Sequence, residues 1–320
     1  MRPSLLMIAI VAALSLACSG CIKNIMMNAE LHSAREAMGA LDEVGDYETA
    51  RAVALASVGQ VEGMHLLAPD NADGLFMLTK TWFGLGYAFI EDEKETAEDR
   101  GDDALAEHER KRARMAYDRA VFFALQLLGQ KAPGFEQAKK DAKSLDKWLK
   151  ENFTTKDDAV NLFWAASPWL TRINLMKADE QEGSTFIAEA YVGLAMLERA
   201  YALDPTVEHY QAMLAMAGYH ARGPMFGEMD QAKAMFDAVM AKTEGKDLMV
   251  PLTYALSYAC VKGDSALYKQ LIDKVLEAPD LDPQLRLQNA IAKRRAARWL
   301  GRKRVKDTCG FDPDATVSSK

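Results

Sequence analysis

The sequence has little that supports catalysis or metal binding. It contains no phosphate-binding loop, no dinucleotide-binding fingerprint, no nucleophile elbow and no HExxH zinc motif. Its five histidines form no spaced pair with a carboxylate on a helix face, and its four cysteines lack metal-ligand spacing. The neighbouring Asp157 and Asp158 are better explained as a helix cap than as a catalytic pair. These absences predict a protein that is not an enzyme and that has no cofactor and no metal site.

The chain is also poor in β-branched residues and carries no excess of positive charge. Valine and isoleucine are sparse, no stretch alternates apolar and polar residues for long, and alanine, leucine and 17 methionines are abundant. This composition predicts an all-α fold. A net charge of −7 and a pI near 5.4 give no general attraction to nucleic acid, so we expect no nucleic-acid partner.

An apolar run near the N-terminus, Leu5–Leu16, is too short to cross a bilayer as a helix. Arg2 precedes this run, and small residues and cysteines follow it, which is the layout of a secretory signal. The end of the run resembles the lipobox that directs lipid onto a cysteine. We expect residues 1–20 to be a signal peptide and Cys21 to be acylated. Cys18 is the alternative attachment residue, and an ordinary signal without lipid is a further interpretation.

Acylation would anchor the protein stably, because the modification supplies more than one acyl chain. Cys21 is followed by Ile22 and not by aspartate, which predicts the outer membrane if the enterobacterial sorting rule applies. We therefore expect a periplasmic protein that is held to the outer membrane by lipid. Export also permits a disulfide, but the spacing of the two remaining cysteines, Cys260 and Cys309, leaves their pairing open.

Two segments carry charge of opposite sign. Residues 91–109 hold ten acidic residues against two basic ones, and Arg286–Lys306 is rich in arginine. We expect the acidic segment to form a solvated helix extension or loop. The basic region belongs to a predicted long last helix, Pro283 to about Lys303, that caps the domain and keeps its cations in solvent. Residues 307–320 are expected to form a polar, disordered tail.

Short helices joined by turns predict a solenoid of helical hairpins. The clearest unit begins at Leu248. Counting from this residue, small and large side chains fall at the positions of a tetratricopeptide repeat (TPR), and Pro279 follows the second helix. Pro205 and Pro69 end two further helices in the same way. The repeats are degenerate, and a helical bundle with accidental spacings is the alternative. We expect residues 21–306 to form this helical domain.

Several segments occur in the order typical of a known family. They are LFWAASPWL, LERAYALDP, HYQAMLAMAGYHARGP, DQAKAMFDAVM, DLMVPLTYALSYA and LRLQNAIAKRRAARWL. Over residues 21–302 the chain resembles the TatT family of TPR-containing lipoproteins associated with TRAP transporters. The resemblance implies a periplasmic helper of an ion-gradient-driven transporter that pairs with the transporter's substrate-binding protein. It also implies that a homotrimer can form, with a pore or groove in each protomer.

Large aromatic side chains are the candidates to line such a pore or groove. The candidates are Trp82, Trp164, Trp169, Tyr219 and Tyr258, together with Arg222. A hairpin solenoid offers a concave face to partners, and its apolar side chains are suited to a channel for a hydrophobic small molecule. Packing in the core is the alternative for each aromatic residue. Arg222 either complements the C-terminal end of its helix or meets a carboxylate.

The sequence therefore predicts an accessory lipoprotein of a TRAP-type transporter. This protein would dock a substrate-binding protein and assist the transfer of a hydrophobic small ligand. A structural TPR lipoprotein that scaffolds cell-envelope assembly is the alternative function. The first function requires an apolar route through the molecule, whereas the second requires only a solid core with a surface groove.

Overall fold

The computed structural model describes residues 25–312, except residues 178, 180 and 223–227. Cys18 and Cys21 therefore lie outside the described residues. The described part of the chain is helical and contains no strand, so the all-α prediction is confirmed. In this part of the chain, no helix combines the length and the apolar character that crossing a membrane requires.

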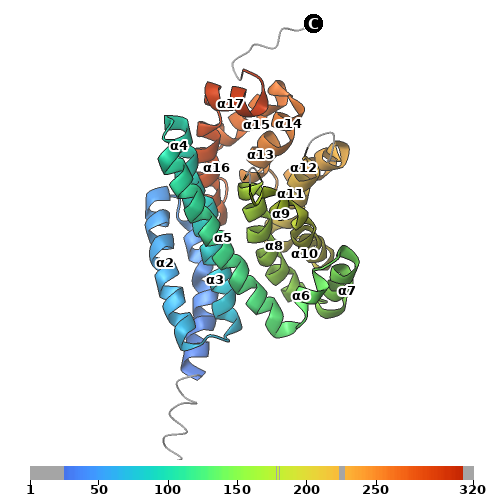
Figure 1. Ribbon diagram of the computed structural model, residues 1–320. Coiled ribbons are helices and arrows are strands. Elements are labelled where there is room, and N and C mark those ends of the chain that lie inside the picture. The colour runs from blue at the N-terminus through green and yellow to red at the C-terminus, as the bar shows by residue number, and fades with distance from the viewer. Residues whose placement is uncertain (1–24, 178, 180, 223–227, 313–320) are drawn as a thin grey trace, which may run out of the picture.

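The N-terminal third forms one side of the molecule (Figure 1). A helix over residues 25–37 is followed by η1 (Met38–Glu43), α2 (Tyr47–Leu67), α3 (Ala72–Gly84), η2 (Leu85–Ile90), α4 (Glu91–Arg100) and α5 (Asp103–Lys131). The side chains of Asp46, Asn71 and Asp102 cap α2, α3 and α5, because each accepts a hydrogen bond from a backbone amide in the first turn. The π-helical turn η2 joins α3 to α4 and shifts the helical register between them.

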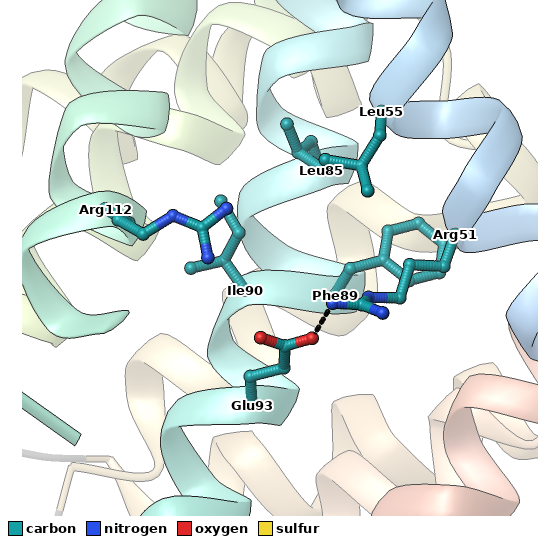
Figure 2. Close-up of a pocket in the computed structure, with 7 residues that line it drawn as sticks. All are labelled: Arg51, Leu55, Leu85, Phe89, Ile90, Glu93 and Arg112. Atoms are coloured by element: carbon teal, nitrogen blue, oxygen red, sulfur yellow. Dashed lines mark hydrogen bonds and ion pairs between the residues drawn. The ribbon is translucent and has the colours of Figure 1, made fainter. Parts of the chain in front are cut away.

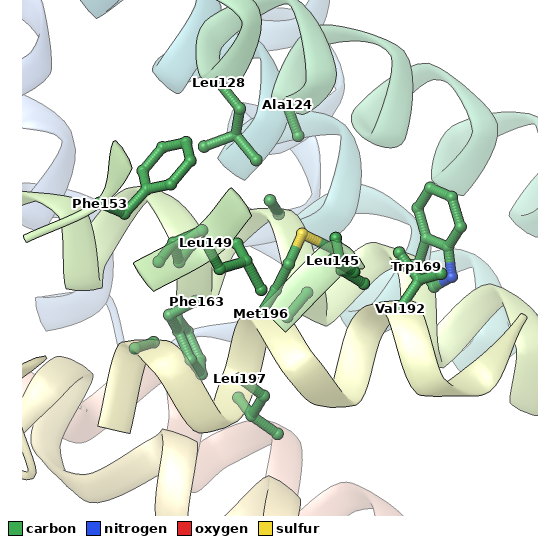
Figure 3. Close-up of a cluster of buried hydrophobic side chains, with 14 of the residues drawn as sticks. Ala124, Leu128, Leu145, Leu149, Phe153, Phe163, Trp169, Val192, Met196 and Leu197 are labelled. Carbon is green, nitrogen blue, oxygen red and sulfur yellow. The ribbon is translucent and has the colours of Figure 1, made fainter. Parts of the chain in front are cut away.

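The middle of the chain packs around α8. Its elements are α6 (Phe135–Ala138), α7 (Ala142–Asn152), α8 (Lys156–Met176), α9 (Gly183–Ala188) and α10 (Ala190–Leu203). A capping box begins α8: the Thr155 hydroxyl accepts from the amide of Asp158, and the Asp158 carboxylate accepts from the amide of Thr155. This confirms the capping role predicted for Asp158. Figure 3 shows part of the core that α5, α7, α8 and α10 enclose.

The C-terminal third of the chain packs against the N-terminal elements. It comprises α11 (Val207–His220), α12 (Met229–Lys242), α13 (Met249–Tyr254), η3 (Ala255–Ala259), α14 (Cys260–Lys262), α15 (Ser265–Glu277), η4 (Pro283–Leu285), α16 (Arg286–Arg298) and α17 (Arg302–Cys309). The helix α16 packs against α13 and α15 and also against η1 and α2. Elements from the N-terminal and C-terminal thirds of the chain are therefore in contact across the fold.

The prediction of one long capping helix at the C-terminus is wrong. The chain leaves the helical conformation at Gly301, whose ψ of 117° is extended, and α17 starts in a new direction. Glycine disfavours a helix interior. The turn also lets Val305 reach the core, where it is fully buried, and lets α17 continue to Cys309.

Helices that are consecutive in sequence also pack as pairs. α11 contacts α12, and α15 contacts both α13 and η3. Pro279 follows α15, in the place that the repeat pattern gives it. These pairs are the hairpins that the sequence suggests, but their assignment to tetratricopeptide repeats and a continuous solenoid remains a prediction.

A disulfide joins Cys260 of α14 to Cys309 of α17, across a sequence separation of 49 residues. The spacing of these cysteines did not decide whether they pair. The redirection of the chain at Gly301 brings Cys309 to Cys260, with their Cα atoms 4.7 Å apart. The bond therefore holds the last described helix to the body of the protein.

The two charged segments pair with each other, so the expectation of solvated charges is wrong for both. α4 carries the acidic side chains, α16 and α17 carry the arginines, and these helices are connected by ion pairs. The pairs join Asp92 to Arg294 and Arg298, Glu95 to Arg298, and Asp99 to Arg304. Asp92 is 1% exposed, because helices far apart in sequence enclose it. We call this set of side chains the α4–α16 ion network.

The close packing of η2 against α5 gives a direct test of core packing. A Cβ atom added at Gly86 would lie 2.8 Å from Cε1 and 3.2 Å from Cδ1 of Tyr117, which is fully buried. We expect Gly86→Ala to lower the free energy of unfolding by about 1–3 kcal/mol, because the Tyr117 ring has no free space to move into. Urea unfolding followed by circular dichroism measures this change.

Gly84 is the matched control, since it lies one residue before η2 and a Cβ there would meet nothing within 4 Å. Gly84→Ala is expected to leave stability unchanged or to raise it by up to about 1 kcal/mol, because alanine is the better helix former. Equal effects of the two substitutions would contradict the close packing of Gly86 against Tyr117.

Candidate functional site

Three half-buried aromatic side chains meet where α3, η2 and α8 come together, and the half-buried Trp82 adjoins one of them, Phe83, in the chain. We call Trp82, Phe83, Tyr87 and Trp164 the aromatic junction. The ring of Phe83 stacks on Tyr87 at 5.6 Å between centroids and meets Trp164 edge-on at 5.9 Å. Each of the four is partly exposed, although their neighbours Leu78 and Leu85 are buried. The junction is therefore partly exposed and not fully closed core.

The aromatic junction also joins separate parts of the core. Trp164 packs against both the α5–α8–α10 cluster and the cluster beneath α2 and α3. Trp82 contacts the second of these and the cluster around η2, whereas Tyr87 connects that cluster to the C-terminal one. The junction thus packs against core clusters from every third of the chain.

Polar atoms without partners lie at the same place. Nε1 of Trp164 and Oδ1 of Asn161, one turn earlier on α8, are buried and have no hydrogen-bond partner among the described residues. Pro168 lacks the amide that would bond the carbonyl of Trp164, so this oxygen also loses its helical partner. An unsatisfied buried polar atom costs about 1–3 kcal/mol. A ligand with one polar group would recover part of this cost.

Charged side chains lie next to the aromatic junction, and we call them the rim. The ammonium of Lys80 lies 5.0 Å from the centroid of the Trp164 ring and 3.9 Å from the carboxylate of Asp42 in η1. Burial raises the pKa of Asp42, Lys80 lowers it, and Glu208 raises it further. Glu208 and His209 at the start of α11 therefore lie close enough to interact with Asp42. The rim combines residues from η1, α3 and α11.

The start of α11 is strained. Three successive non-glycine residues, Glu208, His209 and Tyr210, have left-handed backbone angles with φ of 47°, 54° and 68°. Such residues persist only where the surroundings hold them, and they cluster at functional sites. Here Gln211 donates a hydrogen bond to the buried carboxylate of Asp247, which fixes the chain directly after the strained turn.

A buried cation, Arg295, packs against the ring of Tyr87. The guanidinium of Arg295 lies 4.3 Å from the centroid of the Tyr87 ring and donates a hydrogen bond to the Tyr87 carbonyl. Its nearest carboxylate, on Glu91, is 3.9 Å away and accepts a hydrogen bond from the Tyr117 hydroxyl. Burial raises the pKa of Glu91, although Arg295 and Tyr117 act in the opposite direction. Arg295 thus fixes η2, and with it the position of Tyr87.

Of the six predicted site residues, Trp164 contacts another ring of the junction, Phe83, and Trp82 adjoins Phe83 in the chain. Nε1 of Trp82 donates to Oε1 of Glu62 at 2.8 Å, which orients its ring, whereas Nε1 of Trp164 stays unpaired. Both indoles lie against the same core cluster. Their part in binding a ligand remains a prediction.

The other four predicted residues lie elsewhere. Trp169 is 3% exposed and donates to the carbonyl of Glu189, and Tyr258 is 1% exposed and packs against Tyr254. These two rings contribute to core packing. Tyr219 and Arg222 form a pair of their own, because the Arg222 guanidinium lies 3.4 Å from the Tyr219 ring centroid and donates to its carbonyl.

A small pocket lies outside the aromatic junction (Figure 2). It has a cavity volume of about 10 Å³ and lies between α2, η2, α4 and α5. Its lining residues are Arg51, Leu55, Leu85, Phe89, Ile90, Glu93 and Arg112. An ion pair joins two of these lining residues, Arg51 and Glu93. That space suffices for about one water molecule, so this pocket is too small for a small-molecule ligand.

Sequence reasoning missed Lys80, Phe83, Tyr87 and Asn161. Phe83 and Tyr87 lie in a long apolar run, where periodicity alone does not separate them from buried neighbours. Lys80 interrupts that run, and this single charge in an apolar helix was the available signal. Among the described residues, no group of three or more histidine, cysteine, aspartate or glutamate side chains could hold a metal ion.

Comparison with known proteins assigns the chain to a family. The family model described as TRAP transporter T-component matches residues 43–306, which include every helix from α2 to α16 and the aromatic junction. No curated protein matches the chain. The suspected resemblance is confirmed, and the match supports an accessory role in TRAP transport. The chain belongs to the TRAP transporter T-component family.

Proposed function

We propose that this protein is a periplasmic accessory component of a TRAP-type transporter that docks the substrate-binding protein and assists transfer of a hydrophobic small molecule. One observation carries the ligand part of the proposal. Trp164, whose buried Nε1 has no partner among the described residues, meets Phe83 edge-on, and Phe83 stacks on Tyr87. Apolar lining with a few convergent polar groups is typical of small-molecule sites. The ligand class that fits is apolar with one hydrogen-bond acceptor.

Family membership supports the docking part. A TRAP system uses a substrate-binding protein outside the cytoplasmic membrane, and a T-component associates with such a system. The match leaves the docking face unassigned. The family resemblance also implies a homotrimer, and sedimentation of the purified mature protein would measure the oligomeric state.

The experiment is affinity purification of the tagged full-length protein from its native envelope, followed by mass spectrometry of bound proteins and extracted small molecules. We expect a substrate-binding protein and an apolar compound from the wild type. Trp164→Phe should keep the protein partner and lose most of the compound, because it removes the only donor that the Trp164 ring offers.

Trp299→Phe is the matched control, since Nε1 of Trp299 is also buried without a partner but lies between α16 and α17. This variant should retain the compound. Recovery of envelope-assembly proteins without any small molecule would favour the scaffold function instead.

Lipid attachment is tested separately. We expect Cys21→Ala to release the protein from the membrane fraction into the soluble periplasm, because acyl chains provide the anchor. Fractionation and metabolic labelling with a fatty acid measure this. Full labelling of the Cys21→Ala variant would move the anchor to Cys18, and loss of labelling only in Cys18→Ala would do the same.

A further inference from the structure

Exposed apolar side chains gather at the end of the molecule where the described chain begins. Leu66 is 81% exposed, Ile25 67%, Met26 66% and Leu67 53%. Monomeric proteins expose single apolar residues commonly, but a contiguous group marks an interaction site. We call these four side chains the apolar tip.

Two elements form the apolar tip, and hydrogen bonding holds them together. Nδ2 of the Asn71 side chain, after the end of α2, donates to Oδ1 of Asn28 in the first helix at 2.9 Å. Met27, between the exposed residues and Asn28, packs on the cluster beneath α2 and α3. The start of the first helix and the end of α2 therefore lie at one place, at the lower end in Figure 1.

The position of the anchor fixes what this tip faces. Cys21 lies four residues before Ile25 in the sequence. Four residues span at most about 14 Å even when fully extended. If acyl chains at Cys21 are in a bilayer, Ile25 lies within that distance of its surface. The α4–α16 ion network and α17 lie toward the opposite end of the molecule (Figure 1).

We propose that the apolar tip inserts into the lipid surface next to the anchor and holds the protein upright on the membrane. This inference rests on the lipid attachment in the proposed function. Leucine, isoleucine and methionine at a helix end bury their side chains at the boundary between headgroups and acyl chains, about 5–10 Å deep. The tip then faces the membrane, and α4, α16 and α17 project away from it.

Charge does not drive this contact. Glu30 and Asp70 are exposed at the same end of the molecule and would be repelled by anionic headgroups. Insertion should therefore depend on apolar burial, and raising the salt concentration or the share of anionic lipid should not strengthen it. This distinguishes the tip from a polybasic membrane contact.

The test uses the full-length lipidated protein in phosphatidylcholine vesicles with and without brominated acyl chains. Leu66→Trp adds a fluorescent probe at the tip, and its signal is the difference from the parent protein. We expect bromine to quench the added emission to about half or less, because the probe lies among the upper acyl chains. Leu105→Trp is the matched control at the opposite end of the molecule, where Leu105 is 40% exposed, and its emission should not change.

Mass spectrometry of the same preparations reports acylation, so the two proposals fail separately. Quenching of the Leu66→Trp probe supports the tip whether or not Cys21 is acylated. An acylated protein whose Leu66→Trp probe is not quenched overturns the tip and leaves the anchor in place. If that variant is unquenched and Leu66→Ser with Leu67→Ser abolishes capture of a protein partner, the tip is a protein-docking surface and the membrane proposal is wrong.

Discussion

Replacing Asp92 by alanine is expected to lower the free energy of unfolding by about 3 kcal/mol, because it leaves a buried cation without its nearest partner. Asp92 is 1% exposed and accepts hydrogen bonds from Nε of Arg294, at 2.7 Å, and from Arg298. The Arg298 side chain is only 9% exposed. Its contact with Glu95 keeps part of its charge compensated, so the loss should lie at the lower end of the range for broken buried pairs.

Urea unfolding of the purified mature protein measures this loss. Lys150→Ala is the control, because Lys150 pairs with Asp146 one helical turn away and both side chains are more than half exposed. Exposed pairs contribute about 0–1 kcal/mol, so the control should remain close to wild type. An Asp92→Ala protein as stable as the control would show that the network contributes specificity of pairing and not stability.

The same carboxylate gives the network a pH dependence. Burial acts to raise the pKa of Asp92, but hydrogen bonds from Arg298 and Arg294 outweigh it and hold this pKa below its ordinary value of 3.8. A lowered pKa in the folded state means that the ionised form stabilises the fold. That stability is complete above the unfolded pKa and is lost as the pH falls through the folded one. Asp92→Ala should therefore lose less stability at acidic pH than at pH 7.

Local signals in the sequence were enough to predict most of the helices. Asp46, Asn71 and Asp158 stand where helices begin, and Pro205 and Pro279 stand where they end, because capping and the loss of an amide act within one turn. The helical class follows from composition in the same way. These interactions depend on neighbours in the chain and not on the tertiary fold.

The charge network was not predictable from local signals. A run of acidic residues usually forms a solvated face, and so does an arginine-rich helix. Asp92 and Arg298 are 206 residues apart, and only the closure of the helical array brings them together. The break at Gly301 has a similar cause, since one glycine in a helical pattern is tolerated unless burial of Val305 favours the turn.

The candidate site was predictable only by residue type. Tryptophan suggested Trp82 and Trp164, but the same reasoning selected Trp169 and Tyr258, which lie in the core. Which aromatic rings face the junction depends on the π turn η2, because an extra residue per turn rotates Tyr87 relative to α3. Periodicity with a constant helical repeat cannot place side chains beyond such a turn.

Removing the disulfide, with alanine at both Cys260 and Cys309, is expected to lower the free energy of unfolding by about 2–4 kcal/mol. The bond closes a loop across a separation of 49 residues, and in the chain-entropy account a loop of that length constrains the unfolded state by about 4 kcal/mol. Urea unfolding under oxidising conditions measures the difference. Dithiothreitol should destabilise the wild type by a similar amount and leave the double variant unchanged, which is the internal control.

Removing the disulfide should destabilise α17 first. This helix has eight residues, too few to be stable alone, and it is separated from α16 by the extended residue Gly301. Without the disulfide, α17 is held by the burial of Val305 and by the contacts of Arg304 with Asp99 and with the carbonyl of Glu95. Amide hydrogen exchange should therefore increase in α17 and at the end of α4 before it increases elsewhere. Unchanged exchange in both helices would show that the ion network and the burial of Val305 hold α17 in place without the disulfide.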